Sequence, residues 1–426
     1  MNKKMKKFGV RTSSKAFKRF DKANLLENID YDFLTDVQNY WEKHYGKRIN
    51  PIVHIAFMNL HKEKELRIIP SNIMWNEMIP FFNDMPIRPG YSDKNLYDKL
   101  VDTDQRPETV LKCVHGNYFN RDNEDINEKT AKKLLLSKKE DLIIKPSNMD
   151  NGRGIGKLHY RNGQIYYKGK NASMHRLKNA LGKNFIVQTV IKQHPLMAEP
   201  HPASVNSLRM VTFRWNGTIK HLLTYARFGG GNNVKDHAIA GGVSVTVDDE
   251  GVLGTYGLDT HCIKHTHHPT TNYSFRDNLI QIPNYNEFKK FVVELHKNIL
   301  HHDYVSWDIA VGYDGQPVFI EPNFRGTTWR YQLASRKPIF GDLTEEVLSY
   351  VSNELKNDGY RRSGKLSRKQ ILRKNRRLNR RIKQLHEQLN ETKRELIKVN
   401  SELNYMRSSK SWKITKPLRN IMKGLK

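Results

Sequence analysis

The sequence predicts a mixed α+β fold followed by a long helical C-terminus. Helix-like and strand-like segments intermix along the chain, and dipeptides typical of tight hairpins join neighbouring apolar runs. These dipeptides are Asn162-Gly163, Asn216-Gly217 and Asp314-Gly315. A third observation sets the C-terminus apart, because the apolar residues between Ile371 and Met406 recur in steps of four and three.

The predicted elements divide the chain into five parts. Residues 1–85 read as a basic N-terminus and a helical region with aromatic anchors such as Trp41 and Trp75. Residues 86–350 hold the intermixed strands and helices, including a helix over 287–300. A linker is expected at 351–365, a coiled coil at 366–408 and a basic tail at 409–426.

The coiled coil is predicted from eleven positions that keep the heptad spacing over about five heptads. Nine of these eleven residues are apolar, and Asn375 is a polar residue of the kind that fixes register at such positions. A single solvated helix is the alternative. The pattern favours a parallel homodimer or pairing with a partner helix.

The tail after the coiled coil is basic and amphipathic. Its apolar residues Leu418, Ile421, Met422 and Leu425 are spaced for one helix face, with lysines and an arginine between them. Such a segment suits an anionic membrane surface, although a basic disordered tail has the same composition. The run SWKITKPLR resembles the C-terminal tails of some bacterial glycosyltransferases that build surface polysaccharide.

Composition narrows the class of protein. The chain has 426 residues, which suffices for two or three folded units, and only two cysteines, which fits a reducing compartment. The net charge is +29, but 22 Lys and Arg against four Asp and Glu lie after residue 360. No signal peptide or membrane span is evident, so we expect a cytoplasmic protein with peripheral contact at the inner membrane face. No nucleic-acid readout motif accompanies the basic ends.

One lysine lies where a strand meets a glycine-rich loop. The stretch DLIIKPSNMDNGRGIG ends an apolar run at Lys145 and continues through three glycines and an arginine. A nucleoside triphosphate needs cations on its phosphates and a backbone that can approach them closely. A plain hairpin turn would explain the glycines alone.

Two later strands supply oxygen ligands. Asp308 lies between apolar residues in SWDIAV, while Glu321 and Asn323 are two residues apart in VFIEPN and therefore share one strand face. Three such donors on adjacent strands suit Mg²⁺. A surface hairpin with ordinary acids is the alternative, but a carboxylate after Val-Phe-Ile needs a partner.

Taken together and in this order, the motifs resemble the sugar-transfer-associated branch of the ATP-grasp family, which is found among bacterial polysaccharide genes. The matching stretches, which fall between about residues 90 and 340, are DLIIKPSNMDNGRGIG, FIVQTVIKQHP, SVNSLRMVTFR and SWDIAVGYDGQPVFIEPNFRG. The resemblance implies an ATP-grasp fold, in which two α+β lobes clasp ATP.

The resemblance also implies a set of ATP-binding residues. Lys145 would bind the α- and β-phosphates, residues 151–156 would close as a lid, and 188–191 would face adenine. Lys112 is our choice for the lysine of the N-terminal lobe, with Lys94 as the competitor. The full set is Lys112, Lys145, Ser147, Gly152, Arg153, Gly154, Gly156, Gln188, Thr189, Val190 and Ile191.

Catalytic and metal-binding roles follow from the same resemblance. Arg209 would contact the γ-phosphate or an acyl phosphate, and Arg325 would neutralise developing negative charge. The Mg²⁺ ligands would be Asp308, Glu321 and Asn323.

The implied activity is an ATP-dependent ligase, in which a substrate carboxylate becomes an acyl phosphate and an amine or thiol displaces the phosphate. The substrate would be a small-molecule or sugar-linked carboxylate, such as an acidic sugar or precursor in capsular or surface polysaccharide synthesis. Two other interpretations stay open: a catalytically inactive ATP-binding scaffold that tethers polysaccharide enzymes at the membrane, and a small-molecule kinase.

The segment LDTHCIKHTHHPTT carries a histidine cluster that could be taken for a zinc site. Its spacing matches no standard zinc signature. Loop histidines that help to bind an anionic substrate, or plain exposed histidines, are the other interpretations.

Overall fold

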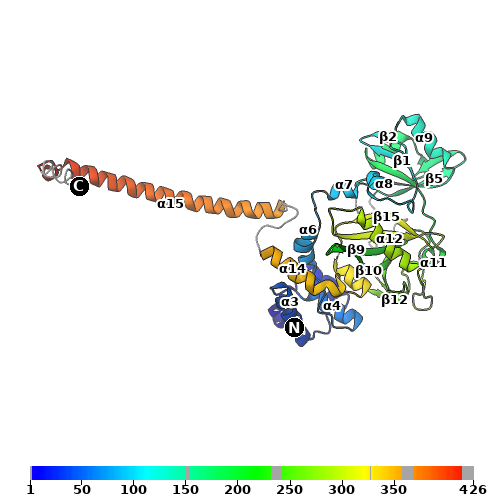
Figure 1. Cartoon of the computed structure of the whole chain (residues 1–426), viewed down its shortest axis with the longest axis horizontal. Helices are drawn as coiled ribbons and strands as arrows, with labels where there is room; N and C mark the ends of the chain where they lie inside the picture. The colour runs from blue at the N-terminus through cyan, green and yellow to red at the C-terminus, as the bar shows by residue number, and fades with distance from the viewer. Residues whose placement is uncertain (1, 150–153, 232–240, 327, 357–367, 415–426) are drawn as a thin grey trace. The chain divides into compact units, whose positions relative to one another are not determined.

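The computed structural model describes residues 2–149, 154–231, 241–326, 328–356 and 368–414. The chain forms two units, Met1–Ser363 and Gly364–Lys426. The first unit contains two antiparallel sheets, and the second contains the C-terminal helices (Figure 1).

The first sheet has eight strands in the order β3-β2-β1-β8-β4-β5-β6-β7. Helices α9 (Glu128–Ser137) and α10 (Met174–Leu181) pack against it through buried residues such as Ala131 and Leu177. Residues Leu142, Ile144 and Phe185 form the centre of this core. The strands are β1 (Thr109–Val114), β2 (Asn117–Phe119), β3 (Asp125–Ile126), β4 (Leu142–Pro146), β5 (Gly156–Arg161), β6 (Gln164–Tyr167), β7 (Lys170–Asn171) and β8 (Phe185–Thr189).

The second sheet has seven strands in the order β13-β12-β11-β10-β9-β14-β15. One face packs against α12 (Tyr285–Lys297), where Phe288 and Leu295 join the core around Trp307. The strands are β9 (Ser207–Trp215), β10 (Thr218–Phe228), β11 (Val243–Val247), β12 (Leu253–Leu258), β13 (Lys264–His265), β14 (Tyr304–Val311) and β15 (Pro317–Asn323). Short α11 (Pro195–Ala198) lies between the two sheets in sequence.

The N-terminal region packs on the other face of the second sheet. Trp41 and Phe82 share a core with Phe213 of β9 and with Val351 of α14 (Thr344–Lys356). The region is helical, as predicted, and it consists of α1 (Asn2–Lys7), α2 (Lys15–Lys22), α3 (Tyr31–Tyr45), α4 (Ile52–His61), α5 (Ser71–Ile73), the π-helix η1 (Met74–Met78) and α6 (Ile79–Phe82). It therefore shares its core with the following sheet.

The three predicted hairpins are confirmed by the strand pairs β5–β6, β9–β10 and β14–β15. Asn162 and Gly163 both adopt positive φ, 48° and 72°, and Asn216 and Gly217 do the same at 48° and 75°. Positive φ at both central residues is what a two-residue hairpin turn of the favoured twist demands, and Asn-Gly tolerates it best.

A connecting segment leads from the N-terminal helices to the first sheet. It comprises α7 (Arg88–Ser92), the 3₁₀ turn η2 (Lys94–Leu96) and α8 (Tyr97–Leu100). After the second sheet come α13 (Thr328–Ser335), η4 (Gly341–Leu343) and α14. Helix α14 continues to Lys356, which lies inside the predicted linker, and residues 357–367 lie outside the described part of the chain.

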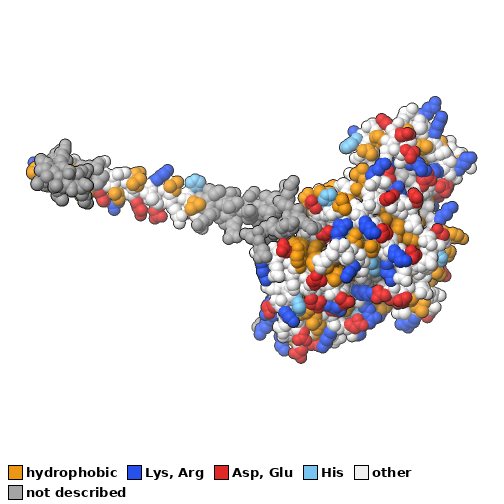
Figure 2. Space-filling model, in the orientation of Figure 1, with side chains coloured by type: hydrophobic (Ala, Val, Ile, Leu, Met, Phe, Trp, Pro, Cys, Tyr) orange, Lys and Arg blue, Asp and Glu red, His pale blue; other side chains and the backbone are white. Residues whose placement is uncertain are grey.

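The second unit contains α15 (Arg368–Ser408), which is 41 residues long, and α16 (Lys410–Ile414). The predicted heptad residues Leu385, Leu389 and Leu396 are 50%, 50% and 60% exposed, and Figure 2 shows hydrophobic side chains open to solvent along this helix. Residues 415–426, which hold the predicted amphipathic tail, lie outside the described residues. Among the described helices, none combines the length and apolar character that crossing a membrane requires.

Candidate functional site

Cross-strand register brings the predicted oxygen ligands and an arginine into one row of the second sheet. Tyr225 of β10 pairs with Arg209 of β9, Arg209 pairs with Asp308 of β14, and Asp308 pairs with Glu321 of β15. Directly opposed residues on adjacent strands share a face, so these four side chains lie side by side. Asn323 follows two residues after Glu321 on the same face.

Asp308 is held by two guanidinium groups. Nε of Arg209 lies 2.5 Å from Oδ1, and Nη1 of Arg227 donates to Oδ2 at 2.9 Å. Burial by itself would raise the pKa of Asp308, but the two arginines more than offset it and the pKa is lowered. The carboxylate is therefore ionised and fixed in place.

A hydrogen-bond network fixes Arg209 in turn. Its Nη1 donates to the Tyr331 hydroxyl of α13 at 2.6 Å, and that hydroxyl lies 3.0 Å from Ser306 Oγ. Ser306 Oγ also donates to the backbone carbonyl of Asn323 at 3.2 Å. Through Tyr331, helix α13 thus connects strands β9, β14 and β15 by hydrogen bonds at the site.

Two buried lysines, Lys94 and Lys145, lie near the carboxylate of Glu321. Nζ of Lys94 lies 3.4 Å from Oε2 of Glu321 and donates to the Met149 carbonyl at 3.0 Å. Burial, then the charge of Lys94, lower the pKa of Lys145 to about 8, and Glu321 offsets part of this effect. Two neighbouring ammonium groups whose charges one carboxylate does not fully balance are suited to bind the phosphates of a nucleotide.

The structure places Lys94, rather than Lys112, beside Lys145. The backbone N–H of Lys94 donates to the Ser147 carbonyl at 2.9 Å, so the η2 turn is joined to the chain just after β4. Lys112 points elsewhere, because its Nζ lies 2.7 Å from Asp98 Oδ2 and 2.6 Å from Asn123 Oδ1.

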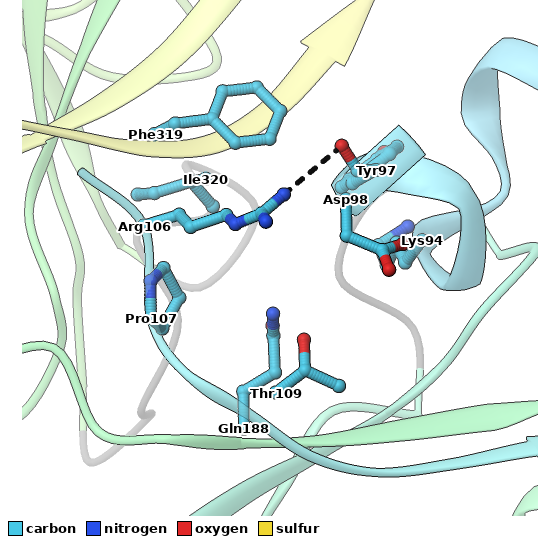
Figure 3. Close-up of a pocket in the computed structure, with 9 residues that line it drawn as sticks. All are labelled: Lys94, Tyr97, Asp98, Arg106, Pro107, Thr109, Gln188, Phe319 and Ile320. Atoms are coloured by element: carbon cyan, nitrogen blue, oxygen red, sulfur yellow. Dashed lines mark hydrogen bonds between the residues drawn. The ribbon is translucent and has the colours of Figure 1, made fainter. Parts of the chain in front are cut away.

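A small cavity lies next to Lys94. Its walls are Gln188 and Thr109 of the first sheet and Phe319 and Ile320 of β15, and Arg106 donates to the Tyr97 carbonyl across it (Figure 3). Lys94, Asp98 and Pro107 complete the lining.

Buried polar atoms around the lysines and the row are unsatisfied. Ser147 Oγ, Gln188 Oε1 and Asn323 Nδ2 have no hydrogen-bond partner among the described residues. Buried polar groups in native proteins almost always have partners, and orphaned groups gathered at one place fit a ligand that would supply them. The donor set fits ATP with Mg²⁺, since Asp308, Glu321 and Asn323 carry the oxygen ligands that this cation prefers.

Residues 74–347 match the sugar-transfer associated ATP-grasp family. The chain belongs to this family, and so to the ATP-grasp ligases. The predicted α+β ATP-grasp fold is confirmed, with the two sheets as its two lobes.

Solved structures similar to the chain include three ligases, each at low identity. VanG D-Ala:D-Ser ligase from Enterococcus faecalis is 13% identical over 61% of each chain, with a TM-score of 0.36. D-alanine–D-alanine ligase from Bacillus anthracis is 12% identical over 63% of this chain and 70% of that chain, with a TM-score of 0.34. L-amino acid ligase from Bacillus licheniformis is 12% identical over 61% and 48%, with a TM-score of 0.31.

This ATP-grasp chain spans 61% of the length of the Enterococcus protein. A comparison with curated proteins found no match.

The predicted lid of this ATP-grasp protein is described only in part. Gly154 adopts φ +76°, and a Cβ there would lie 2.6 Å from Cγ of Pro146, so only glycine fits. Gly156 begins β5, where a Cβ would lie 2.5 Å from the Tyr167 ring. Gly152 and Arg153 lie outside the described residues.

The predicted hinge, residues 188–191, spans the end of β8. Gln188 lines the cavity, and Thr189 accepts a hydrogen bond from the Glu108 backbone through its Oγ1 at 3.0 Å. Val190 and Ile191 lie beyond the last residue of the strand. The predicted hinge residues therefore include the point where the chain leaves the first sheet.

Arg325 is exposed, and its guanidinium lies 5.1 Å from the ring centroid of Trp75. Stacking on an aromatic face restrains an arginine while it keeps its charge. The N-terminal region thus contributes an aromatic residue beside a predicted catalytic group, which sequence reasoning did not foresee.

Two further residues at the site were missed from sequence. Arg227 contacts Asp308, and Tyr331 accepts from Arg209. The signal for Arg227 was present, because it lies two residues after Tyr225 on β10 and so shares its face. Nothing in the sequence pattern of α13 marked Tyr331.

The histidine segment packs locally. His268 is buried and its Nε2 lies 2.8 Å from the Gly229 carbonyl, whereas His265 lies 3.3 Å from Asp259. Among the residues that the structure describes, no group of three or more His, Cys, Asp or Glu side chains could hold a metal ion.

Proposed function

We propose that this ATP-grasp protein is a carboxylate–amine or carboxylate–thiol ligase that uses Mg-ATP. The observation that carries the proposal is the meeting of Lys94, Lys145 and Glu321 beside a cavity between the two sheets. Two buried cations and an acidic edge are what a triphosphate with its divalent cation requires. The substrate would be an acidic sugar or precursor in capsular or surface polysaccharide synthesis.

The first chemical step transfers the γ-phosphoryl group. A substrate carboxylate oxygen forms a bond to the γ-phosphorus while the bond to the β,γ-bridging oxygen breaks, which releases ADP. Lys94 and Lys145 hold the phosphates, and Arg209 lies where it can stabilise the transferring group. Asp308, Glu321 and Asn323 would hold Mg²⁺, which neutralises phosphate charge. Lys94 takes the role that the sequence suggested for Lys112.

The second step forms the product bond. An amine nitrogen or a thiol sulfur attacks the acyl carbon, loses its proton, and displaces inorganic phosphate. No protein nucleophile is needed in either step. The remaining residues proposed to contact ATP or substrate lie in three parts of the chain. Gln188, Thr189, Val190 and Ile191 form the proposed hinge, Gly154 and Gly156 belong to the proposed lid, and Arg325 is exposed after β15.

The test is Mg²⁺-dependent ADP formation with pooled uronic-acid sugars, free and nucleotide-linked, together with mixed amino acids, amines and thiols. ADP release that needs both pools and disappears in Glu321→Gln and Lys145→Ala supports the ligase. The matched controls are Glu287→Gln and Lys220→Ala, which change exposed residues of the same types. ADP release with the sugar pool alone would favour a kinase. Absence of turnover with intact ATP binding in Glu321→Gln would favour a scaffold.

We also propose that α15 pairs with a second copy of the chain or with a partner helix. Its exposed leucines keep the heptad spacing, and a row of half-exposed leucines is costly in water. The basic tail would then place the enzyme at the inner face of the plasma membrane, with the ligase acting in the cytoplasm.

A further inference from the structure

The N-terminal helical region is hydrogen-bonded to the chain just after β15. Asn83, the residue after α6, is fully buried. Its Nδ2 donates to the Phe324 carbonyl at 3.1 Å and to the Tyr304 carbonyl at 2.8 Å. The Phe324 side chain is itself buried in the core that α12 shares with the second sheet. The residue directly before Arg325 is therefore fixed to the N-terminal region.

The residue directly after Arg325 packs against the proposed phosphoryl site. A Cβ on Gly326 would lie 2.6 Å from the Tyr331 ring, so the backbone approaches this ring as closely as only glycine allows. The Tyr331 hydroxyl accepts a hydrogen bond from Arg209. The backbone of Arg325 thus lies between two anchored neighbours, one of which contacts the network that holds Arg209.

The side chain of Arg325 is held by an aromatic ring rather than by an acid. Among the residues that the structure describes, none forms a hydrogen bond or an ion pair with Arg325, and its guanidinium lies 5.1 Å from the centroid of the Trp75 ring. An ion pair would use the N–H donors of the guanidinium, whereas stacking on a ring face leaves them open to a ligand. The contact with Trp75 therefore orients this cation without neutralising it.

Trp75 lies on an anchored turn. It belongs to the π-helix η1, and π-helical turns are rare and frequently found at functional sites. Met74 and Met78 of this turn are fully buried, whereas the Trp75 side chain is 38% exposed. Glu77 of the same turn accepts a hydrogen bond from the Tyr45 hydroxyl at 2.9 Å. The turn thus holds the indole at the surface from a base that is packed into the core.

A surface stacking pair without a function is the alternative explanation. Such a pair needs neither an anchored backbone nor a place beside a reactive centre. Arg325 has both, because it lies two residues after Asn323 and directly before the glycine that meets Tyr331. Catalysis requires this kind of placement, since a displacement of about 1 Å can cost about 100-fold in rate.

We propose that Trp75 is a positioning residue for Arg325, and that the indole orients the guanidinium toward the phosphoryl group that is transferred beside Arg209. The inference rests on the proposed function, in which Arg325 neutralises the negative charge that develops during transfer. It makes the N-terminal helical region, which belongs to neither sheet, a part of the active site. Without the indole, the protein would still bind Mg-ATP but would stabilise the transition state less well.

Binding of a transition-state mimic tests this role without a known substrate. Mg-ADP with aluminium fluoride imitates the transferring phosphoryl group, and calorimetry would compare its affinity with that of Mg-ADP alone. We expect Arg325→Met to weaken binding of the mimic by about 10- to 100-fold and Trp75→Leu by about 2- to 5-fold. Both variants should bind Mg-ADP alone as wild type does. In the ADP-release assay, Trp75→Leu should lower kcat by the same factor and leave the KM for ATP unchanged.

A double-mutant cycle separates positioning from a merely structural role. In the Arg325→Met background, Trp75→Leu should have no further effect on binding of the mimic, because no guanidinium remains to be oriented. Trp75→Phe keeps an aromatic face and should recover most of the loss. The matched control is Trp412→Leu, which changes a tryptophan of the second unit that is also 38% exposed. If Trp75→Leu fails to fold in thermal unfolding, Trp75→Met serves instead.

Three results would overturn the positioning role while leaving the proposed function in place: equal binding of the mimic by Trp75→Leu and wild type, an equal loss from Trp75→Leu in the wild-type and Arg325→Met backgrounds, or a wild-type protein that binds Mg-ADP with no preference for the mimic. A change in the KM for ATP at unchanged kcat would also overturn it. A wild-type protein that binds neither Mg-ADP nor Mg-ATP would reject the proposed function, and the positioning role with it.

Discussion

Lys145 offers a test in which activity and stability move in opposite directions. The pKa of its ammonium falls from the ordinary 10.5 to about 8 because the group is buried near Lys94. At 1.36 kcal/mol per pH unit, this fall corresponds to a destabilisation of about 3 kcal/mol at pH 7, where the lysine is charged in both the folded and the unfolded chain. Lys145→Met should therefore raise the free energy of unfolding at pH 7.

The pH dependence isolates this effect from changes in packing. Because the folded pKa is depressed, the cost is complete below pH 8 and disappears as the pH rises from 8 to 10.5. At pH 9.5 the folded lysine is neutral, and only about 1.4 kcal/mol of the cost remains. The stability difference between Lys145→Met and wild type should thus shrink by about 2 kcal/mol from pH 7 to pH 9.5.

Urea denaturation at the two pH values measures this difference, with and without Mg-ATP. The exposed Lys220 provides the control, since Lys220→Met should give a difference that does not change with pH. Mg-ATP should stabilise wild type much more than Lys145→Met, because the variant loses a phosphate contact worth about 10- to 100-fold in affinity. An equal pH response of the two methionine variants would refute the claim that the Lys145 charge is desolvated.

Three further changes test other parts of the molecule. Gly154→Ala should weaken Mg-ATP binding and destabilise the fold by about 1 kcal/mol or more, measured by calorimetry and thermal unfolding, because its φ is +76° and its Cβ would press on Pro146. Leu396→Asp should convert a dimer to a monomer in light scattering, whereas Ile397→Asp, which changes a neighbour outside the heptad positions, should not. Asp308→Asn should destabilise the fold by about 3–5 kcal/mol in urea denaturation, because it leaves buried guanidinium groups without their counter-charge, and unchanged stability would contradict this assignment.

The sequence alone indicated the parts of the site that depend on short-range pattern. Glu321 and Asn323 share a face because strand side chains alternate, and no long-range information is needed to know it. The Asn-Gly hairpins were equally local, since the turn itself demands positive φ. The order of the motifs then sufficed to indicate the ATP-grasp family.

Tertiary structure decided which charged groups meet. Whether Lys94 or Lys112 lies beside Lys145 depends on a backbone hydrogen bond between Lys94 and Ser147, which are 53 residues apart in the sequence. Asp308 of β14 and Arg227 of β10 come into contact because both strands flank β9 in the sheet. Neither sequence motif indicates this strand order.

What the sequence by itself determined is the α+β class, the family, the shared strand face of Glu321 and Asn323, and the heptad helix, because each follows from spacing within one segment or from motif order. Only the tertiary structure decided that Lys94 lies beside Lys145 and that Asp308 pairs with two arginines. Those outcomes depend on burial and on contacts between distant segments, where a charge is stabilised or left uncompensated by neighbours that the chain brings together only when folded.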